Sequence, residues 1–80
     1  MHVVIKGAKT IEEYKKTQQE IISRAEVAYY THKNVTPNWS EGEAVKAWIN
    51  DDGEICLQYE SGSCWAYKDL DMPFPTWKKI

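Results

Sequence analysis

Residues 44–69 read AVKAWINDDGEICLQYESGSCWAYKD, in which two turn signals separate three segments rich in apolar and aromatic residues. Residues 50–53, Asn-Asp-Asp-Gly, suit a type I turn with Gly53 in the left-handed conformation, which makes a three-residue hairpin loop. A two-residue loop would shift the register by one and set apolar side chains opposite polar ones. With a second turn at 60–63, the stretch predicts a three-stranded antiparallel meander. The expected cross-strand pairs are Ile49 with Ile55, Ala47 with Leu57, Val45 with Tyr59, Tyr59 with Trp65 and Leu57 with Tyr67.

The two faces of this meander should differ, because side chains alternate along a strand. One face is apolar and is expected to pack on a helix. It collects Val45, Ala47, Ile49, Ile55, Leu57, Tyr59, Trp65 and Tyr67. The other face is expected to be acidic and mixed, with an exposed Trp48. On that face the predicted register sets Cys56 opposite Lys68 and Cys64 opposite Glu60, so the cysteines are too far apart for a disulfide and should be free thiols.

The segment before the meander predicts a strand and a long helix. HVVI at 2–5, closed by Gly7, is typical of a short strand. Thr10 and Glu13 have the spacing of a capping box, and the apolar residues that follow recur every three or four positions, which predicts a helix over about residues 11–31. Residues 41–50 could form a short helix instead of a strand, although the hairpin pattern favours the strand.

The expected fold is therefore a single α+β domain over residues 1–80, in the order β-α-β-β-β. One long amphipathic helix packs on one face of a mainly antiparallel sheet. The pattern leaves open whether the first strand lies beside the second or the fourth.

Charge is distributed unevenly along the chain, whose net charge is −2. Between residues 40 and 71 there are eight acidic residues and only two basic ones, Lys46 and Lys68, so this part carries −6. A negative sheet region would repel phosphates, which disfavours direct binding of nucleic acid. The amino terminus has neither a long apolar run nor a cleavage site, so no membrane anchor or signal peptide is expected and the predicted location is cytoplasmic.

No pattern of residues marks a cofactor site, a metal site or a catalytic centre, and no enzymatic activity is expected. The two cysteines lack the close spacing of zinc ligands, and both histidines lie far from them in sequence. His2 and His32 are expected on the surface, with His32 near a helix end where a cation suits the dipole. A nucleophile made by Cys56 or Cys64 with His32 has no local motif to support it.

An acidic surface that holds an exposed aromatic residue favours docking on a basic groove of another protein. In this hypothesis Trp48 is the anchor, and nearby carboxylates steer the encounter. These carboxylates belong to Glu54, Glu60, Asp69 and Asp71. The predicted function is a non-catalytic protein-interaction module, an inhibitor or adaptor whose partner is basic and could itself bind nucleic acid.

The tail at 71–77, DMPFPTW, adds Phe74 and Trp77 to this hypothesis. These large apolar side chains either cover the chain's own core or anchor a partner. In size and in its content of Trp and Tyr, the chain resembles small proteins that bacterial phages and mobile elements encode, including inhibitors of host defence. No sequence motif carries this likeness.

Two other functions stay open. A nucleic-acid-binding domain would use the positive residues of the helix, Lys15, Lys16 and Arg24, with Lys6 or Lys9 beside them. A self-associating structural domain would bury Trp48 and the outer sheet face in a symmetric homodimer.

Overall fold

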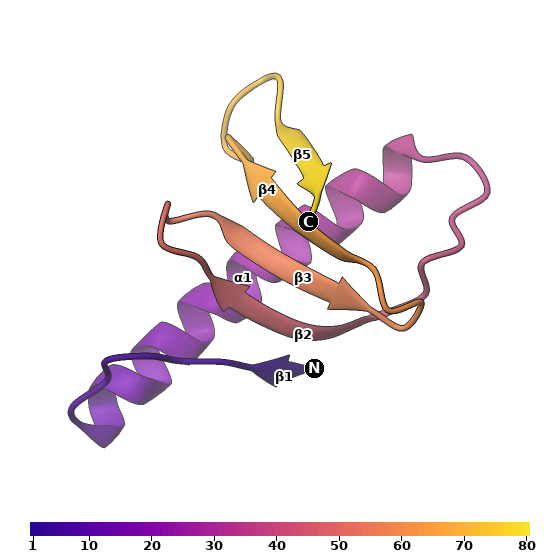
Figure 1. Cartoon of the computed structure of the whole chain (residues 1–80). Coiled ribbons are helices and arrows are strands. Elements are labelled where there is room, and N and C mark those ends of the chain that lie inside the picture. The colour runs from indigo at the N-terminus through magenta and orange to yellow at the C-terminus, as the bar shows by residue number, and fades with distance from the viewer.

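The computed structural model describes residues 1–80 as one helix packed on one face of a five-stranded sheet (Figure 1). The elements are β1 (His2–Val3), α1 (Ile11–Val35), β2 (Ala44–Ile49), β3 (Ile55–Tyr59), β4 (Cys64–Lys68) and β5 (Thr76–Lys79). The α+β class, the strand at 44–49 and the placement of the helix on one face are as the sequence predicts. The tail also forms a strand, β5, which the sequence did not predict.

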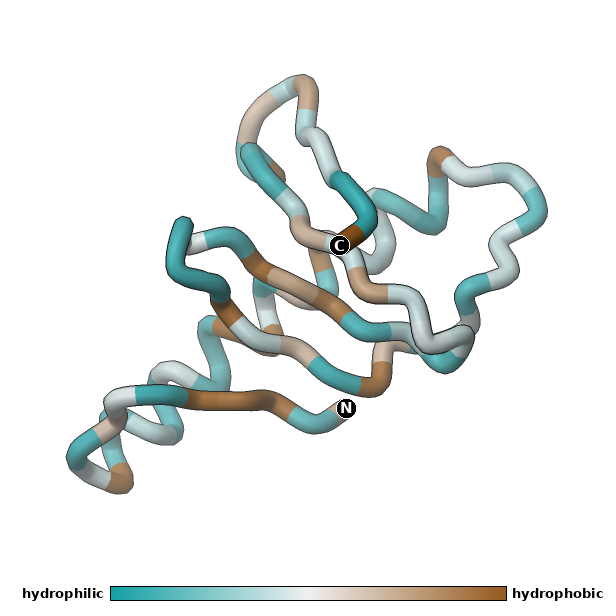
Figure 2. The backbone as a smooth tube through the Cα atoms, in the orientation of Figure 1, coloured by the Kyte–Doolittle hydropathy of each residue, from teal (hydrophilic) through white to brown (hydrophobic).

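The strands lie in the order β1-β2-β3-β4-β5. β1 runs parallel to β2, and α1 is the crossover that such a parallel pair requires. The remaining neighbours are antiparallel, so the meander predicted for 44–69 continues through β5. Figure 2 shows hydrophobic residues along the strands and hydrophilic residues at the turn that joins β2 to β3.

The first hairpin has the predicted three-residue loop. The amide of Gly53 donates to the carbonyl oxygen of Asn50 at 3.0 Å, and Gly53 has a φ of 79°. Ile49 pairs with Ile55 and Ala47 with Leu57, as expected. The expected pairing of Val45 with Tyr59 is wrong, because a bulge lies between Ala44 and Lys46 and Ala44 takes that place.

The second hairpin is shifted by two residues from the prediction. Its loop is Glu60-Ser61-Gly62, of the same kind as the first, with the amide of Gly62 donating to the carbonyl oxygen of Tyr59 at 2.9 Å. The observed pairs are Leu57 with Trp65, Ile55 with Tyr67, Cys56 with Ala66 and Gln58 with Cys64. A shift of two residues leaves every side chain on its predicted face.

The helix begins with the predicted cap, in which the side chain of Thr10 accepts a hydrogen bond from the amide of Glu13. The carboxylate of Glu13 accepts from the amide of Lys9 at 2.9 Å, and not from the amide of Thr10 as in the predicted capping box. The first turns of α1 extend past the sheet (Figure 1). Ile11 and Tyr14, which belong to the apolar spacing that predicts a buried helix face, are therefore exposed. No helix of the structure combines the length and the apolar character needed to cross a membrane.

The buried stripe of α1 ends in His32, which is only 3% exposed and is not the surface residue that the sequence predicted. It continues the spacing of Ile21, Ala25 and Ala28, all of which are buried. Aromatic rings surround the imidazole, with ring centroids 4.7–4.8 Å away for the three nearest indoles. These belong to Trp39, Trp65 and Trp77. The part of the core that packs against the last turns of α1 is therefore an aromatic cluster around one histidine.

Polar atoms inside this cluster are paired with one another. The Nδ1 atom of His32 lies 2.7 Å from the hydroxyl of Tyr67, which also hydrogen-bonds the hydroxyl of Tyr59. Burial lowers the pKa of His32, against a smaller opposing influence of the Glu41 carboxylate. Burial likewise raises the pKa of Tyr59 to about 12. These groups are therefore uncharged at neutral pH, and they act as hydrogen-bonded members of the core.

Candidate docking site at the acidic end of the sheet

Two loops meet at one end of the sheet, because β2 and β4 both run toward that end. One is the hairpin turn at 50–54, and the other is the β4–β5 loop at 69–75 (Figure 1). Together they carry five carboxylates. These are Asp51, Asp52, Glu54, Asp69 and Asp71, and we call this region the acidic end.

The hairpin turn is held by its own side chains and by the helix. The side-chain oxygen of Asn50 accepts from the amides of Asp52 and Glu54 at 3.0 and 2.9 Å, and its amide nitrogen donates to the Glu54 carboxylate at 3.0 Å. The guanidinium of Arg24 donates to the carbonyl oxygen of Gly53 at 2.8 Å. The turn is therefore fixed both to itself and to α1.

The β4–β5 loop exposes large apolar side chains beside its two carboxylates. Asp69 takes a left-handed conformation (φ 58°), and its carbonyl oxygen accepts from the amide of Met72 at 3.0 Å. Leu70 packs against the core, whereas Met72 and Phe74 point outward, 57% and 86% exposed. Phe74 is the most exposed of the large hydrophobic residues.

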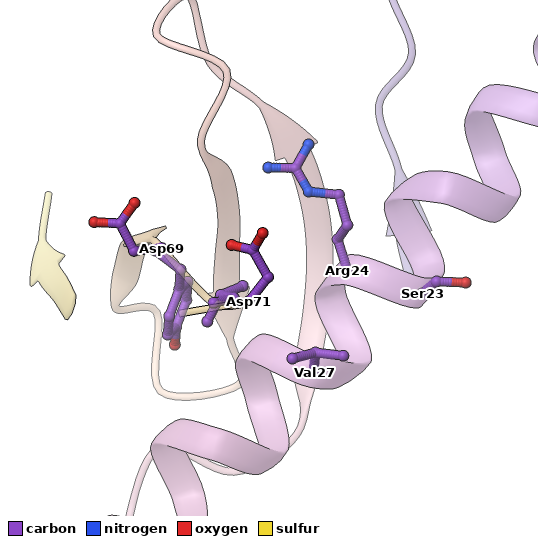
Figure 3. Close-up of a pocket in the computed structure, with 7 residues that line it drawn as sticks. Ser23, Arg24, Val27, Asp69 and Asp71 are labelled. Carbon is purple, nitrogen blue, oxygen red and sulfur yellow. The ribbon is translucent and has the colours of Figure 1, made fainter. Parts of the chain in front are cut away.

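A groove of about 590 Å³ separates this loop from the helix. Figure 3 shows Asp69 and Asp71 on the loop side of the groove, and Arg24 and Val27 on the helix side. The groove is open, with one cationic group on its helix side and two carboxylates on its loop side. Its chemistry suits contact with a side chain of another protein better than enclosure of a small molecule.

Four of the seven residues predicted to bind a partner lie together, and the other three lie in separate places. Glu54, Asp69, Asp71 and Phe74 come together at the acidic end. Glu60 lies in the turn at the opposite end of the sheet, where its carboxylate accepts from the amide of Glu43 at 2.7 Å. Trp48 lies half-buried on the sheet face that the helix leaves uncovered, with the Lys46 ammonium 5.4 Å from its ring centroid. Trp77 packs against His32 in the chain's own core.

The residues predicted for nucleic-acid binding are spread along the helix. Lys15 and Lys16 are exposed on the part of α1 that extends past the sheet, whereas Arg24 holds the hairpin turn. Glu20 shares the surface between Lys16 and Arg24. The helix therefore presents a mixed surface rather than a continuous positive one.

The cysteines are free thiols on the uncovered face of the sheet, at a diagonal of the β3–β4 ladder. Burial raises the pKa of the Cys56 thiol. His32 lies on the helix side, so the sheet separates it from both thiols. No group of three or more His, Cys, Asp or Glu side chains is arranged to hold a metal ion.

Comparison of the chain with protein-family models, with curated proteins and with solved structures finds no match.

Proposed function

We propose that the protein is a non-catalytic protein-interaction module that docks the β4–β5 loop on a basic groove of a partner protein. The observation that supports this most directly is Phe74, which is 86% exposed at the acidic end. Burying a Phe side chain is worth roughly 1.5–3 kcal/mol, so a phenylalanine held in water is a ready anchor for a pocket. Met72 adds a second, adaptable apolar group beside it.

Charge supports a basic partner. The two loops of the acidic end carry five carboxylates, against Arg24, Lys68 and Lys78 beside them. Opposite charges across an interface mainly raise the rate of encounter and fix orientation. Of the residues predicted from the sequence, this proposal uses Phe74 as the anchor and Glu54, Asp69 and Asp71 for steering. Trp48, Glu60 and Trp77 have no part in it.

The framework around the loop limits the entropy lost on binding. Pro73 and Pro75 flank Phe74 and restrict the backbone, and Leu70 fixes the start of the loop on the core. A loop that is already restricted costs less to order than a flexible one. An inhibitor or adaptor that occupies a basic groove is the form of interaction that this arrangement fits best.

The test is affinity capture from nuclease-treated bacterial lysate with three forms of the protein: wild type, Phe74→Ala and Ile11→Ala. Ile11 is a matched control, because it is 75% exposed at the start of α1, on the β1 side of the sheet, whereas the β4–β5 loop lies at the opposite edge (Figure 1). We expect a protein retained by wild type and by Ile11→Ala, and lost with Phe74→Ala. A captured protein that Phe74→Ala retains equally well would show that the loop is not the docking element.

Charge steering is tested with the captured partner by stopped-flow association. Neutralising Asp69 and Asp71 to Asn should slow association and weaken its dependence on salt, with a smaller effect on dissociation. Neutralising Glu20 and Glu26 to Gln, on the exposed helix surface, is the control of equal charge change. Equal slowing by both pairs would mean that only the net charge matters and that the acidic end has no special role.

A further inference from the structure

The sheet face opposite α1 is uncovered and carries more positive than negative charge. The register places Lys46 of β2, Lys68 of β4 and Lys78 of β5 on this outer face. The register also places Glu54 on this face, where its carboxylate accepts a hydrogen bond from the side chain of Asn50. Asp52 and Asp69 of the adjoining loops line a hollow together with Lys68 and Lys78. The net charge of −6 over residues 40–71 therefore does not describe this surface. Most of those carboxylates lie in the loops, and β5 adds Lys78 to the face.

A row of paired residues crosses the outer face from β2 to β5. Trp48 pairs with Cys56, Cys56 with Ala66, and Ala66 with Lys78. Cys56 and Ala66 are buried although no second layer lies over them, because their short side chains lie between larger neighbours. The row is about 14 Å long, at about 4.8 Å for each strand, with an indole at one end and an ammonium group at the other.

Stacking surface and positive charge lie together on this outer face. The ammonium of Lys46 lies 5.4 Å from the ring centroid of Trp48. Lys68 is two residues from Ala66 on β4, on the same face as Lys78 of the neighbouring strand. Single-stranded nucleic acid is bound by this combination, in which bases stack on aromatic rings and cations follow the phosphates.

We propose that the outer face of the sheet binds single-stranded nucleic acid across the strands, with one base on Trp48 and phosphates beside Lys46, Lys68 and Lys78. Asp52, Glu54 and Asp69 lie at the acidic end beside Lys68 and Lys78 and repel a phosphate backbone. The nucleic acid therefore crosses the strands along this row rather than following them to that end. Lys68 and Lys78 border the acidic end, whereas Trp48 and Lys46 lie on β2, away from Phe74. One molecule can therefore hold a protein partner by Phe74 and a nucleic acid by the sheet.

The test is fluorescence anisotropy of labelled oligo(dT) and oligo(U) of about 12 nucleotides, titrated at about 50 mM salt and above. We expect Trp48→Ala to weaken binding by at least about fivefold and Trp48→Phe, which keeps a stacking ring, to weaken it less. Reversing Lys46, Lys68 and Lys78 to Glu should lower the slope of log affinity against log salt by about 2, at about 0.7 for each phosphate contact.

The matched control is the reversal of Lys15 and Lys16 to Glu, which changes charge on the helix without touching the outer face. This variant should bind like wild type apart from a modest general electrostatic loss. The proposal is overturned if wild type binds no oligonucleotide, if a duplex of the same length binds as tightly, or if the helix variant loses as much affinity per charge as the sheet variant. It is also overturned if sedimentation shows a dimer that Trp48→Lys makes monomeric, since a second copy would then occupy this face. None of these results depends on Phe74, so the docking proposal stands or fails separately.

Discussion

The Nδ1 atom of His32, on the last turns of α1, lies 2.7 Å from the hydroxyl of Tyr67 on β4. The same hydroxyl pairs with that of Tyr59 on β3, so one chain of hydrogen bonds joins the helix to two strands. All three side chains are buried. Because each of these groups depends on its neighbour for a hydrogen-bond partner, the hydrogen-bond network contributes to stability only when all three groups are present.

Removing the middle hydroxyl should therefore be costly. We expect Tyr67→Phe to lower the free energy of unfolding by about 1–3 kcal/mol, because it leaves His32 Nδ1 and the Tyr59 hydroxyl without the partner they share. Urea unfolding measures the change. Tyr30→Phe is the control, since Tyr30 is exposed on the same helix and its hydroxyl should matter by less than about 0.5 kcal/mol. Equal stability of both variants would mean that the hydroxyl chain makes no net contribution.

Stability should also depend on pH through His32. Burial lowers the pKa of His32 in the folded protein below its value of 6.5 in the unfolded chain. The unfolded state therefore takes up a proton first, and the free energy of unfolding should fall as the pH drops below about 6.5. The stability that neutral His32 contributes is fully present above about pH 6.5. It decreases as the pH falls from there to the lower pKa of His32 in the folded state.

The measurement is urea unfolding between about pH 7.5 and pH 5, in wild type and in His32→Gln. The variant lowers stability throughout, but its stability should change less across this window because the titrating group is gone. The lowered pKa of Glu41 acts below 4.5 and stays outside the window. An identical change with pH in both proteins would show that another group is responsible.

Two turn glycines should differ in their tolerance of a side chain. Gly42 and Gly53 have nearly the same φ, 81° and 79°, so Ala strains the backbone equally at both. A Cβ atom at Gly53 meets nothing within 4 Å, whereas one at Gly42 would lie 2.9 Å from the Cβ of Glu60. We expect Gly53→Ala to cost about 1 kcal/mol and Gly42→Ala clearly more, measured by thermal and urea unfolding. Equal losses would mean that the 60–63 turn moves freely to make room.

Turn residues and the alternation of side chains along the strands explain why one hairpin register could be predicted and the other could not. Asn50 and Gly53 specify a loop of defined length, so the first register could be predicted up to the bulge at Val45. At the second turn, registers that differ by two residues leave the same side chains on each face, so alternation alone could not choose between them. The observed choice repeats the loop type of the first hairpin, with Gly62 in the place of Gly53.

The core and the candidate site were predicted only in part. His32 continues the helical spacing of buried Ala25 and Ala28, and that spacing was the available signal, but a histidine at a helix end also suits the surface. β5 has four residues, two of them lysines, and forms because β4 offers an open edge rather than because of its own pattern. Among the predicted partner-binding residues, strand direction brings Glu54 and Asp69 together and sends Glu60 to the other end of the sheet.

The two large aromatic residues of the tail provide the last prediction, because the fold gives them opposite roles. Trp77 faces the core, with its ring centroid 4.8 Å from that of His32, whereas Phe74 is 86% exposed. We expect Trp77→Ala to lower the free energy of unfolding by about 2 kcal/mol or more, and Phe74→Ala to change it by less than about 0.5 kcal/mol. Deletion of residues 72–80 should have the largest effect, since it removes β5 and uncovers β4. Urea unfolding followed by circular dichroism separates these cases, and a deletion variant as stable as wild type would show that β5 is not part of the folded domain. Stability that depends on Trp77 but not on Phe74 would leave the exposed phenylalanine without a structural reason, which is the condition that a docking anchor must meet.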